Sequence, residues 1–227
     1  EIYTLSLHDA LPIFGRRIIR VMEASYLTRH PRLRDFLSFS GFVIAVLIGT
    51  LLLNAYVFRS FSVSGHSMDN TLADGDRLII NRIPVTMAQI QNKPYLPERG
   101  KIVVFVNPVY RPGAPDRYII KRVIAFPGER VVVKDGVLTV YNNKYPEGFH
   151  PDDSTRKNNV GPKSPTSHSG EWTVPEGSIF VAGDNRVGDN SFDSRSGLGF
   201  IPTYDIVGPV ALRIFPLGSA KDRKSVV

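Results

Sequence analysis

The chain has 227 residues, no cysteine, 42% hydrophobic residues and a formal net charge of +7. The hydrophobic share excludes a disordered chain, and the lack of cysteine excludes disulfides, a thiol nucleophile and metal sites with cysteine ligands. The length accommodates one medium-sized domain and an anchor.

The two ends of the chain look foreign to the rest. The codons CAC GAC GCT CTT CCG ATC encode HDALPI, and their reverse complement encodes DRKSVV, the sequence of residues 222–227. The opening stretch EIYTLSLHDALPI also resembles a translated sequencing-library adaptor. We therefore predict that residues 1–13 and 222–227 are adaptor sequence, and exclude them from fold and function. An authentic polar tail at each end is the alternative.

Residues 36–58, FLSFSGFVIAVLIGTLLLNAYVF, carry no charge. As a helix they would be about 34 Å long, against a hydrocarbon core of about 30 Å, and they have no polar face. This pattern predicts a transmembrane helix rather than a buried soluble helix or a cleavable signal peptide. Arginines dominate residues 14–35, so this basic segment is expected to be cytoplasmic and residues 59–221 extracytoplasmic. Part of the basic charge comes from these arginines, which membrane topology explains better than nucleic-acid binding does, so no nucleic-acid partner is expected.

The extracytoplasmic part contains short β-branched runs separated by Gly, Pro and Asp turns, which predicts a mainly β domain. Asp135-Gly136 between two apolar alternations is a strong hairpin signal. Residues 142–170 are polar and rich in turn residues, so we expect an exposed insertion there. A β-barrel or folded sheet with this insertion fits best. The predicted strands lie within residues 60–65, 76–82, 100–108, 117–126, 129–142, 177–183 and 205–215.

Ser67, in SVSGHSMDNTL, is a candidate nucleophile. It follows Arg59 by eight residues, so it would lie within about 28 Å of the membrane edge. A serine needs a base within hydrogen-bond reach. His66 would point to the opposite face of an extended chain, and His150 and His168 lie in the polar insertion, where surface histidines are common.

Lys121 is the better candidate for the base. It stands in RYIIKRVIAF, where apolar neighbours can exclude water. Desolvation disfavours the charged form of a lysine, and a neutral amine can accept a serine proton. From the residues alone, a snorkelling or ion-paired lysine stays an alternative.

Other catalytic patterns are weaker. The STRK stretch at residues 154–157 matches a Ser-x-x-Lys spacing, but it lies in the insertion and no SDN or KTG motif accompanies it. The chain has no Walker A loop, HExxH motif or cluster of metal-ligand spacing, so no cofactor or metal is expected.

Four stretches in order resemble the boxes of the type I signal peptidases. They are SGHSMDNTL, GDRLIINR with RGKIVVF, RYIIKRVIAFPGE, and GDNRVGDNSFDSRSGLGFIP. The resemblance implies a membrane-anchored Ser/Lys endopeptidase that removes signal peptides from exported preproteins after an Ala-x-Ala-like motif at the bacterial cell membrane. The single anchor and Gly65 are similar to members of the Gram-positive type.

The same resemblance implies roles for individual residues. Ser67 would be the nucleophile and Lys121 the general base, with Ser191 orienting Lys121. The Ser67 amide, with Ser64, would form the oxyanion hole. Residues that would hold the last loop are Asp184, Asp193 and Arg195, and those that would line the substrate pockets, or simply form core, are Phe61, Val63, Met68 and Ile120.

The chain departs from the family pattern in three places. Gly65 occupies a position where many members carry a serine that assists the oxyanion hole. Asn70 replaces the usual proline, and residues 187–190 lengthen the last box, which makes the mapping of Ser191 less direct. Two rival functions stay open: an anchored β domain that only binds exported chains, and a self-cleaving repressor domain, which would want a DNA-binding module in place of residues 36–58.

Overall fold

The computed structural model describes residues 30–114, 117–153, 155 and 161–215. Two compact units, Glu1–Leu52 and Leu53–Val227, divide the chain and are described separately. The predicted adaptor segments 1–13 and 222–227, and most of the predicted cytoplasmic segment 14–35, lie outside the described residues.

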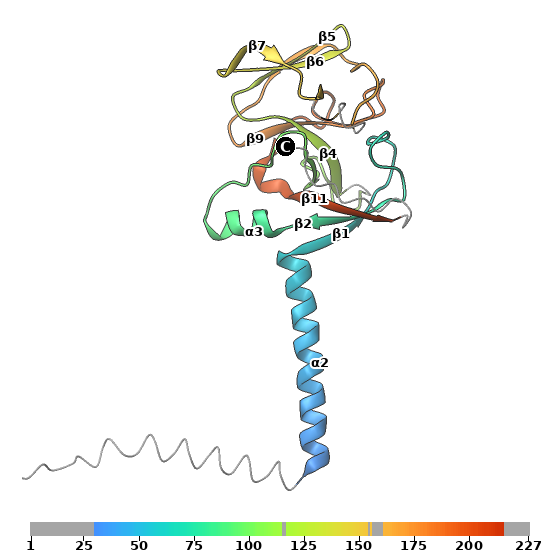
Figure 1. Ribbon diagram of the computed structural model, residues 1–227, viewed down its shortest axis with the longest axis vertical. Coiled ribbons are helices and arrows are strands. Elements are labelled where there is room, and N and C mark those ends of the chain that lie inside the picture. Colours follow the sequence, from blue (N-terminus) through green and yellow to red (C-terminus); the bar gives the residue numbers. More distant parts are fainter. Residues whose placement is uncertain (1–29, 115–116, 154, 156–160, 216–227) are drawn as a thin grey trace, which may run out of the picture. The chain divides into compact units, whose positions relative to one another are not determined.

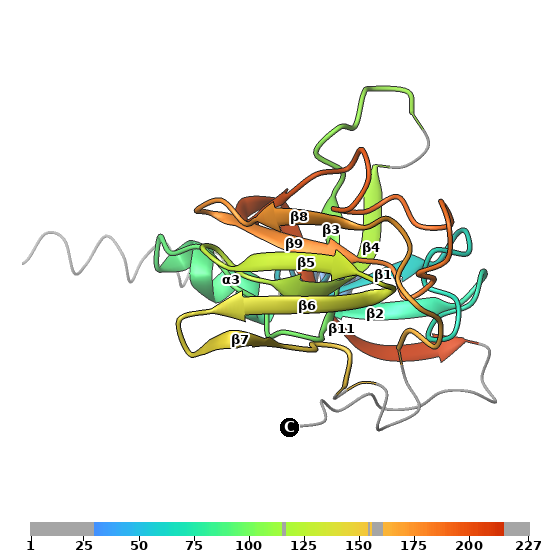
Figure 2. The ribbon, with the colours of Figure 1, turned by 90° about the horizontal axis from the view of Figure 1, so that it is seen from above.

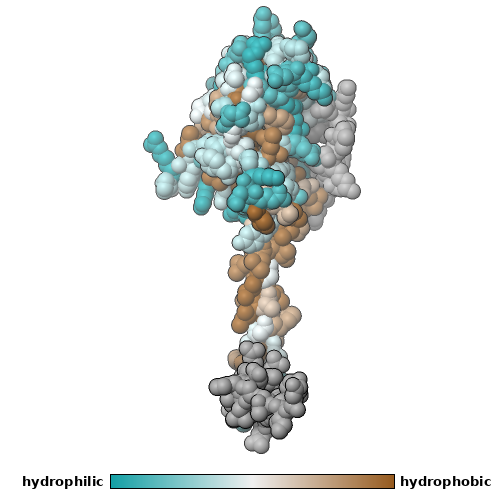
Figure 3. All heavy atoms as spheres, turned by 90° about the vertical axis from the view of Figure 1, so that its left-hand side faces the viewer, coloured by the Kyte–Doolittle hydropathy of each residue, from teal (hydrophilic) through white to brown (hydrophobic). Residues whose placement is uncertain are grey.

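Helix α2 spans Pro31–Tyr56, and none of its residues is buried. It begins five residues before the predicted segment 36–58, because proline is tolerated in the first turn of a helix, and it stops two residues earlier because β1 begins at Phe58. Apolar side chains surround it, as the brown column in Figure 3 shows. Its length and composition suffice to cross a membrane.

Within the described residues there are two sheets, and the larger has seven strands in the order β1-β2-β11-β3-β4-β9-β10 (Figure 1). The pairings between these strands are antiparallel. The long strand β11 pairs with β2 on one side and with β3 on the other, and β4 lies between β3 and β9. Their bounds are β1 Phe58–Ser62, β2 Arg77–Asn81, β3 Ile102–Val106, β4 Tyr118–Ala125, β9 Ser178–Ala182, β10 Ile201–Pro202 and β11 Ile206–Phe215, with a short 3-10 helix, η1, at Thr203–Asp205.

The second sheet has four strands in the order β7-β6-β5-β8, which Figure 2 shows side by side. Asp135 and Gly136, both at positive φ, join β5 to β6, and Lys134 pairs with Val137, so the predicted hairpin is confirmed. The bounds are β5 Arg130–Lys134, β6 Val137–Asn142, β7 Tyr145–Phe149 and β8 Gly170–Thr173.

In the described part of the chain, apolar side chains of the two sheets and of the segments that connect their strands form three buried clusters. The alternation in β5, where Val131 and Val133 are buried between more exposed neighbours, is typical of a strand with one face on the core. By contrast Lys121–Ala125 of β4 are buried in succession, because this strand lies in the middle of the sheet. The mainly β prediction, with an N-terminal apolar helix, is confirmed.

Two details differ from the expectations. Helix α3, Ile83–Ile90, was not predicted; Pro84 stands in its first turn, where proline fits a helix. The predicted insertion 142–170 contains strand β7, which pairs with β6, and it buries Asp152 and Thr166 at 4% exposure each. Part of this segment therefore packs on the domain rather than standing in solvent.

Candidate active site

Ser67 lies in a compact turn between β1 and β2. The amides of Thr71 and Leu72 donate to the Met68 carbonyl, and the Asp69 amide donates to the His66 carbonyl. Met68 and Leu72 are each 1% exposed and pack in the same apolar cluster. Burial of these two side chains anchors the turn, leaves Asn70 exposed and Asp69 partly exposed, and turns Thr71 inward.

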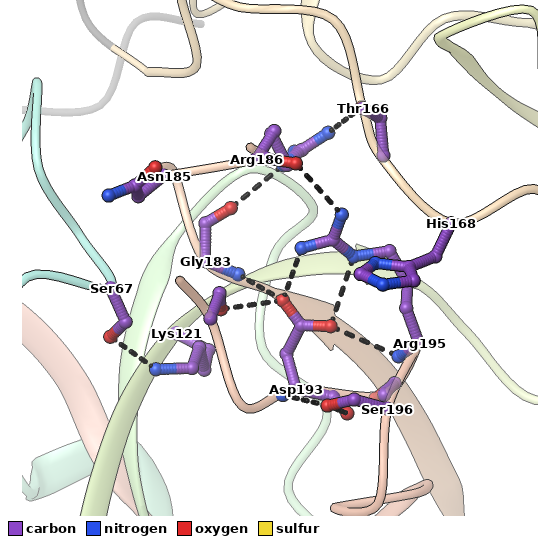
Figure 4. A network of polar contacts seen from close by, with 12 residues as sticks. Ser67, Lys121, Thr166, His168, Gly183, Asn185, Arg186, Asp193, Arg195 and Ser196 are labelled. Atoms are coloured by element: carbon purple, nitrogen blue, oxygen red, sulfur yellow. Dashed lines mark hydrogen bonds and ion pairs between the residues drawn. The ribbon is translucent and has the colours of Figure 1, made fainter. Parts of the chain in front are cut away.

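Lys121 reaches this turn from the middle of the larger sheet. On β4 it pairs with Val103 of β3, and the side chain is 3% exposed. Its Nζ lies 2.6 Å from Ser67 Oγ, within hydrogen-bond distance. Figure 4 shows the two side chains pointing toward one another. The nucleophile and base that the sequence suggested are thus in contact although 54 positions separate them.

The histidines that competed with Lys121 have other partners. His66 is largely exposed and faces Asp69, His168 faces Asp189, and His150 approaches Thr139 and the Leu138 carbonyl. In the part of the chain that the structure describes, none of the three forms a hydrogen bond with Ser67.

Asp184 joins the strand that carries Lys121 to the turn that carries Ser67. Its carboxylate is fully buried and receives a two-pronged ion pair from Arg122, with Nε 2.7 Å from Oδ1. Thr71 Oγ1 donates to the same carboxylate. Because Arg122 directly follows Lys121, this pair ties both catalytic candidates to the loop after β9.

Asp193 organises that loop from inside. Arg195 holds its carboxylate with two side-chain bonds, the Gly183 amide donates to Oδ2 at 2.9 Å, and Ser191 Oγ donates to Oδ2 at 2.6 Å. Burial by itself raises the pKa of Asp193, but the hydrogen bonds and charge of Arg195, helped by Ser191 and Gly183, outweigh it and lower the pKa below 3.8. The expected contact from Ser191 to Lys121 stays a prediction.

Gly183 and Asn185 bring this loop against Ser67. The Asn185 amide donates to the Ser67 carbonyl at 3.1 Å, and its side-chain amide donates to the His66 carbonyl. A Cβ at Gly183 would lie 2.8 Å from Ser191 Cβ, and closer still to Ser191 Oγ and the Ser67 carbonyl oxygen. Only glycine fits at this contact.

The two expected oxyanion donors differ in their surroundings. Among the described residues, none accepts a hydrogen bond from the Ser67 amide, so this donor is available. Ser64 is exposed, and the neighbouring Gly65 amide is bound to Asp74. No hydrogen bond joins Ser64 to Ser67 within the described segments.

The expected substrate-pocket residues share one apolar cluster. Val63 and Met68 are buried, whereas Phe61 and Ile120 are partly buried on its edge. The Phe61 ring packs edge-on against Tyr118 at 5.1 Å between centroids. In the sequence, members of this cluster stand close to both Ser67 and Lys121. The partly exposed members, Phe61 and Ile120, are those that a ligand could contact.

Sequence reasoning missed four residues of this site: Thr71, Arg122, Gly183 and Arg186. Each stands inside a motif quoted for the family resemblance, and Arg122 and Gly183 stand directly beside a residue that was assigned a role. Membership of these motifs was the available signal, but the side-chain partners lie on other segments of the chain. Within the described ranges no group of three His, Cys, Asp or Glu side chains could hold a metal ion.

Comparison with known proteins identifies the family. Residues 34–215 match the family model described as signal peptidase, peptidase S26. Signal peptidase I T of Bacillus subtilis is 35% identical over 182 residues, covering 80% of this chain and 86% of that protein. Signal peptidase I of Bacillus licheniformis is 33% identical over 179 residues, covering 79% and 88%. A crystal structure of a signal peptidase I from Enterococcus faecalis has a TM-score of 0.37 and 29% identity, covering 50% of this chain and 96% of that chain. The chain therefore belongs to the type I signal peptidases of family S26, Gram-positive type, and is a serine endopeptidase.

Proposed function

We propose that this protein cleaves signal peptides from exported preproteins after an Ala-x-Ala-like motif, with Ser67 as nucleophile and Lys121 as general base. The family acts on the signal peptides of preproteins; the dyad and the cleavage motif are the new elements of the proposal. The observation that carries it is the 2.6 Å contact between Lys121 Nζ and Ser67 Oγ, made by a lysine that is 3% exposed.

The environment of Lys121 suits a base. An amino group removed from water is biased toward its neutral form, which can accept the proton of a serine hydroxyl. Arg122 lies next in the chain, but Asp184 neutralises its charge. In our proposal Ser191 completes the setting by accepting a hydrogen bond from the amine, while Asp193 and Arg195 keep Ser191 in position.

Acylation begins when Ser67 Oγ attacks the carbonyl carbon of the scissile bond. Its proton passes to Lys121 Nζ, and the negative charge on the substrate oxygen is met by the Ser67 amide, with Ser64 as a weaker second donor. The protonated Lys121 then gives its proton to the leaving amine as the C–N bond breaks. The signal peptide stays on Ser67 as an ester.

Deacylation repeats these steps with water. Lys121 takes a proton from the water, the resulting hydroxide attacks the ester carbonyl, and the proton goes to Ser67 Oγ as the C–O bond breaks. An extended substrate segment would pair with a strand edge, and its small side chains would fill shallow hollows lined by Phe61, Val63, Met68 and Ile120.

We further propose a single-pass arrangement in a bacterial cell membrane, with the N-terminus cytoplasmic and residues 59–221 extracytoplasmic. The arginines before α2 favour this orientation by the positive-inside tendency. A preprotein exposes its cleavage site where its signal helix leaves the bilayer, so a catalyst only a few residues beyond its own anchor would meet it there.

The test is cleavage of an Ala-x-Ala preprotein by the purified chain in detergent with phospholipid, compared with Ser67→Ala and Lys121→Ala. We expect cleavage after the motif by the parent and losses of at least about 1,000-fold in both variants, since removing a nucleophile or its base disables the unit. Circular dichroism checks that the variants fold. Full activity in either folded variant would overturn the dyad.

A further inference from the structure

Among the described residues Arg186 is the largest fully buried side chain, yet the proposed chemistry does not use it. Its guanidinium forms a two-pronged pair with Asp152 in which both N···O distances are 2.8 Å. It also donates to Thr166 Oγ1 at 3.0 Å and, through Nε, to the Gly183 carbonyl at 2.8 Å. Figure 4 shows Arg186 between Gly183 and Thr166. One side chain thus connects the insertion to the backbone that touches Ser67.

The backbone adds further bonds between the insertion and this loop. The Ser167 amide donates to the Arg186 carbonyl at 3.0 Å, and the Ser167 carbonyl accepts from Arg195 Nη1 at 3.2 Å. In the lengthened part of the loop, the Gly188 amide donates to Ser167 Oγ at 2.8 Å. We call Asp152, Thr166, Ser167 and Arg186 the clasp.

Gly183 is the point at which the clasp reaches the catalytic centre. Its amide is held by Asp193 and its carbonyl by Arg186, so both polar groups of this residue are fixed. Its Cα packs where a Cβ would collide with Ser191 and Ser67. A small rotation of this peptide would therefore move Ser191 or the Ser67 backbone, and reaction rates respond steeply to such displacements.

We propose that Arg186 and Asp152 are positioning residues for catalysis: they hold the Gly183 peptide, and through it Ser67 and Ser191, in the reactive arrangement. The insertion is thereby a working part of the catalytic centre. This inference rests on the proposed peptidase function, since kcat is its principal readout. A stabilising role alone would leave kcat unchanged once the fold is preserved.

The decisive variant is Asp152→Leu/Arg186→Met, which removes both charges and keeps similar volumes. Exchange of a buried ion pair for apolar residues is often neutral or stabilising, so this variant is expected to fold. It cannot hold the Gly183 carbonyl. The matched control is Glu129→Leu/Arg99→Met, which replaces another ion pair of low exposure, in which Arg99 Nη2 donates to both Glu129 carboxylate oxygens. Asp152→Asn serves as a second, milder variant.

We expect kcat for preprotein cleavage to fall about 10- to 100-fold in the clasp variant, with KM changed less than about threefold and an unchanged melting temperature. The control variant should keep the parental kcat. The kcat of Asp152→Asn should lie between those of the parent and the clasp variant. Parental kcat in a folded clasp variant overturns the inference. An equal loss in the control does so too, because the effect would then be general.

Amide hydrogen exchange gives a readout that does not depend on the reaction. We expect the Gly183 and Asn185 amides, which donate to Asp193 and Ser67, to lose protection in the clasp variant and not in the control. If the parent itself fails to cleave, the proposed function fails, and exchange alone decides the inference: unchanged protection of these amides overturns it.

Discussion

Gly183 has no room for even one methyl group. In Gly183→Ala the added Cβ would lie 2.8 Å from Ser191 Cβ, with Ser191 Oγ and the Ser67 carbonyl closer still. None of these atoms is the free end of a flexible side chain, because Ser191 is buried and bound to Asp193 and the Ser67 carbonyl accepts from Asn185. The backbone of one of the two loops must therefore move.

Two magnitudes follow from this crowding. Overpacking of a dense site costs about 1–3 kcal/mol of stability, which a folded domain can tolerate. The displacement needed to reach an ordinary contact is on the order of 1 Å, and a misplacement of that size can cost about 100-fold in rate. We therefore expect a folded protein whose kcat falls about 100-fold and whose KM changes less, because the atoms nearest the added Cβ belong to Ser191 and Ser67 and not to the proposed pocket residues.

The assay is steady-state cleavage of the preprotein substrate, with thermal unfolding measured in parallel. Gly197→Ala is the matched control: it lies in the same segment between β9 and β10, and its Cβ would meet only the ring edge of the exposed Phe192, at 3.2 Å. The control should keep the parental kcat. A Gly183→Ala protein with parental kcat and stability would refute the crowding argument.

Three further predictions concern single residues. Asn70 has a φ of 78°, whereas a proline ring holds φ at about −65°. In thermal denaturation, Asn70→Pro should therefore lower the free energy of unfolding by about 1–3 kcal/mol, whereas Asn70→Gly should keep a stability near that of the parent. A proline variant as stable as the parent would contradict the positive φ at this position. Because the pKa of Asp193 is lowered in the folded protein, its carboxylate stabilises the fold above pH 3.8, and this stabilisation is lost as the pH falls through the folded-state pKa. In denaturant unfolding, the free energy of unfolding of Asp193→Asn should therefore lie below that of the parent by a difference that narrows below about pH 4. A difference that stays constant with pH would contradict this prediction. Burial, with the charge of Glu98, raises the pKa of Tyr95 from 10.0 to about 12. The contribution of the neutral Tyr95 to folding stability should therefore persist up to pH 10 and decline toward pH 12. An absorbance titration that shows Tyr95 ionising near pH 10 would contradict this prediction.

The amino-acid sequence by itself determined the features that depend on local pattern. An uncharged run long enough to cross a membrane became a helix with no buried residue, because nothing in its composition offers a polar face. Alternating β-branched runs became strands, and Asp135-Gly136 became a hairpin turn, because positive φ at both positions is available to these residues. The quoted motifs also pointed to the family that the comparisons identify.

Tertiary structure decided what depends on contacts between distant segments. Periodicity places Lys121 in a strand, but only the pairing of β4 with its neighbours and the path of the turn after β1 bring its amine to Ser67. The burial of Asp152 could not be foreseen in a polar, turn-rich stretch. A buried carboxylate is tolerated only with a charged partner, and that partner, Arg186, lies 34 positions away. Local composition carries no record of such pairings, because they are settled by which surfaces the fold brings together.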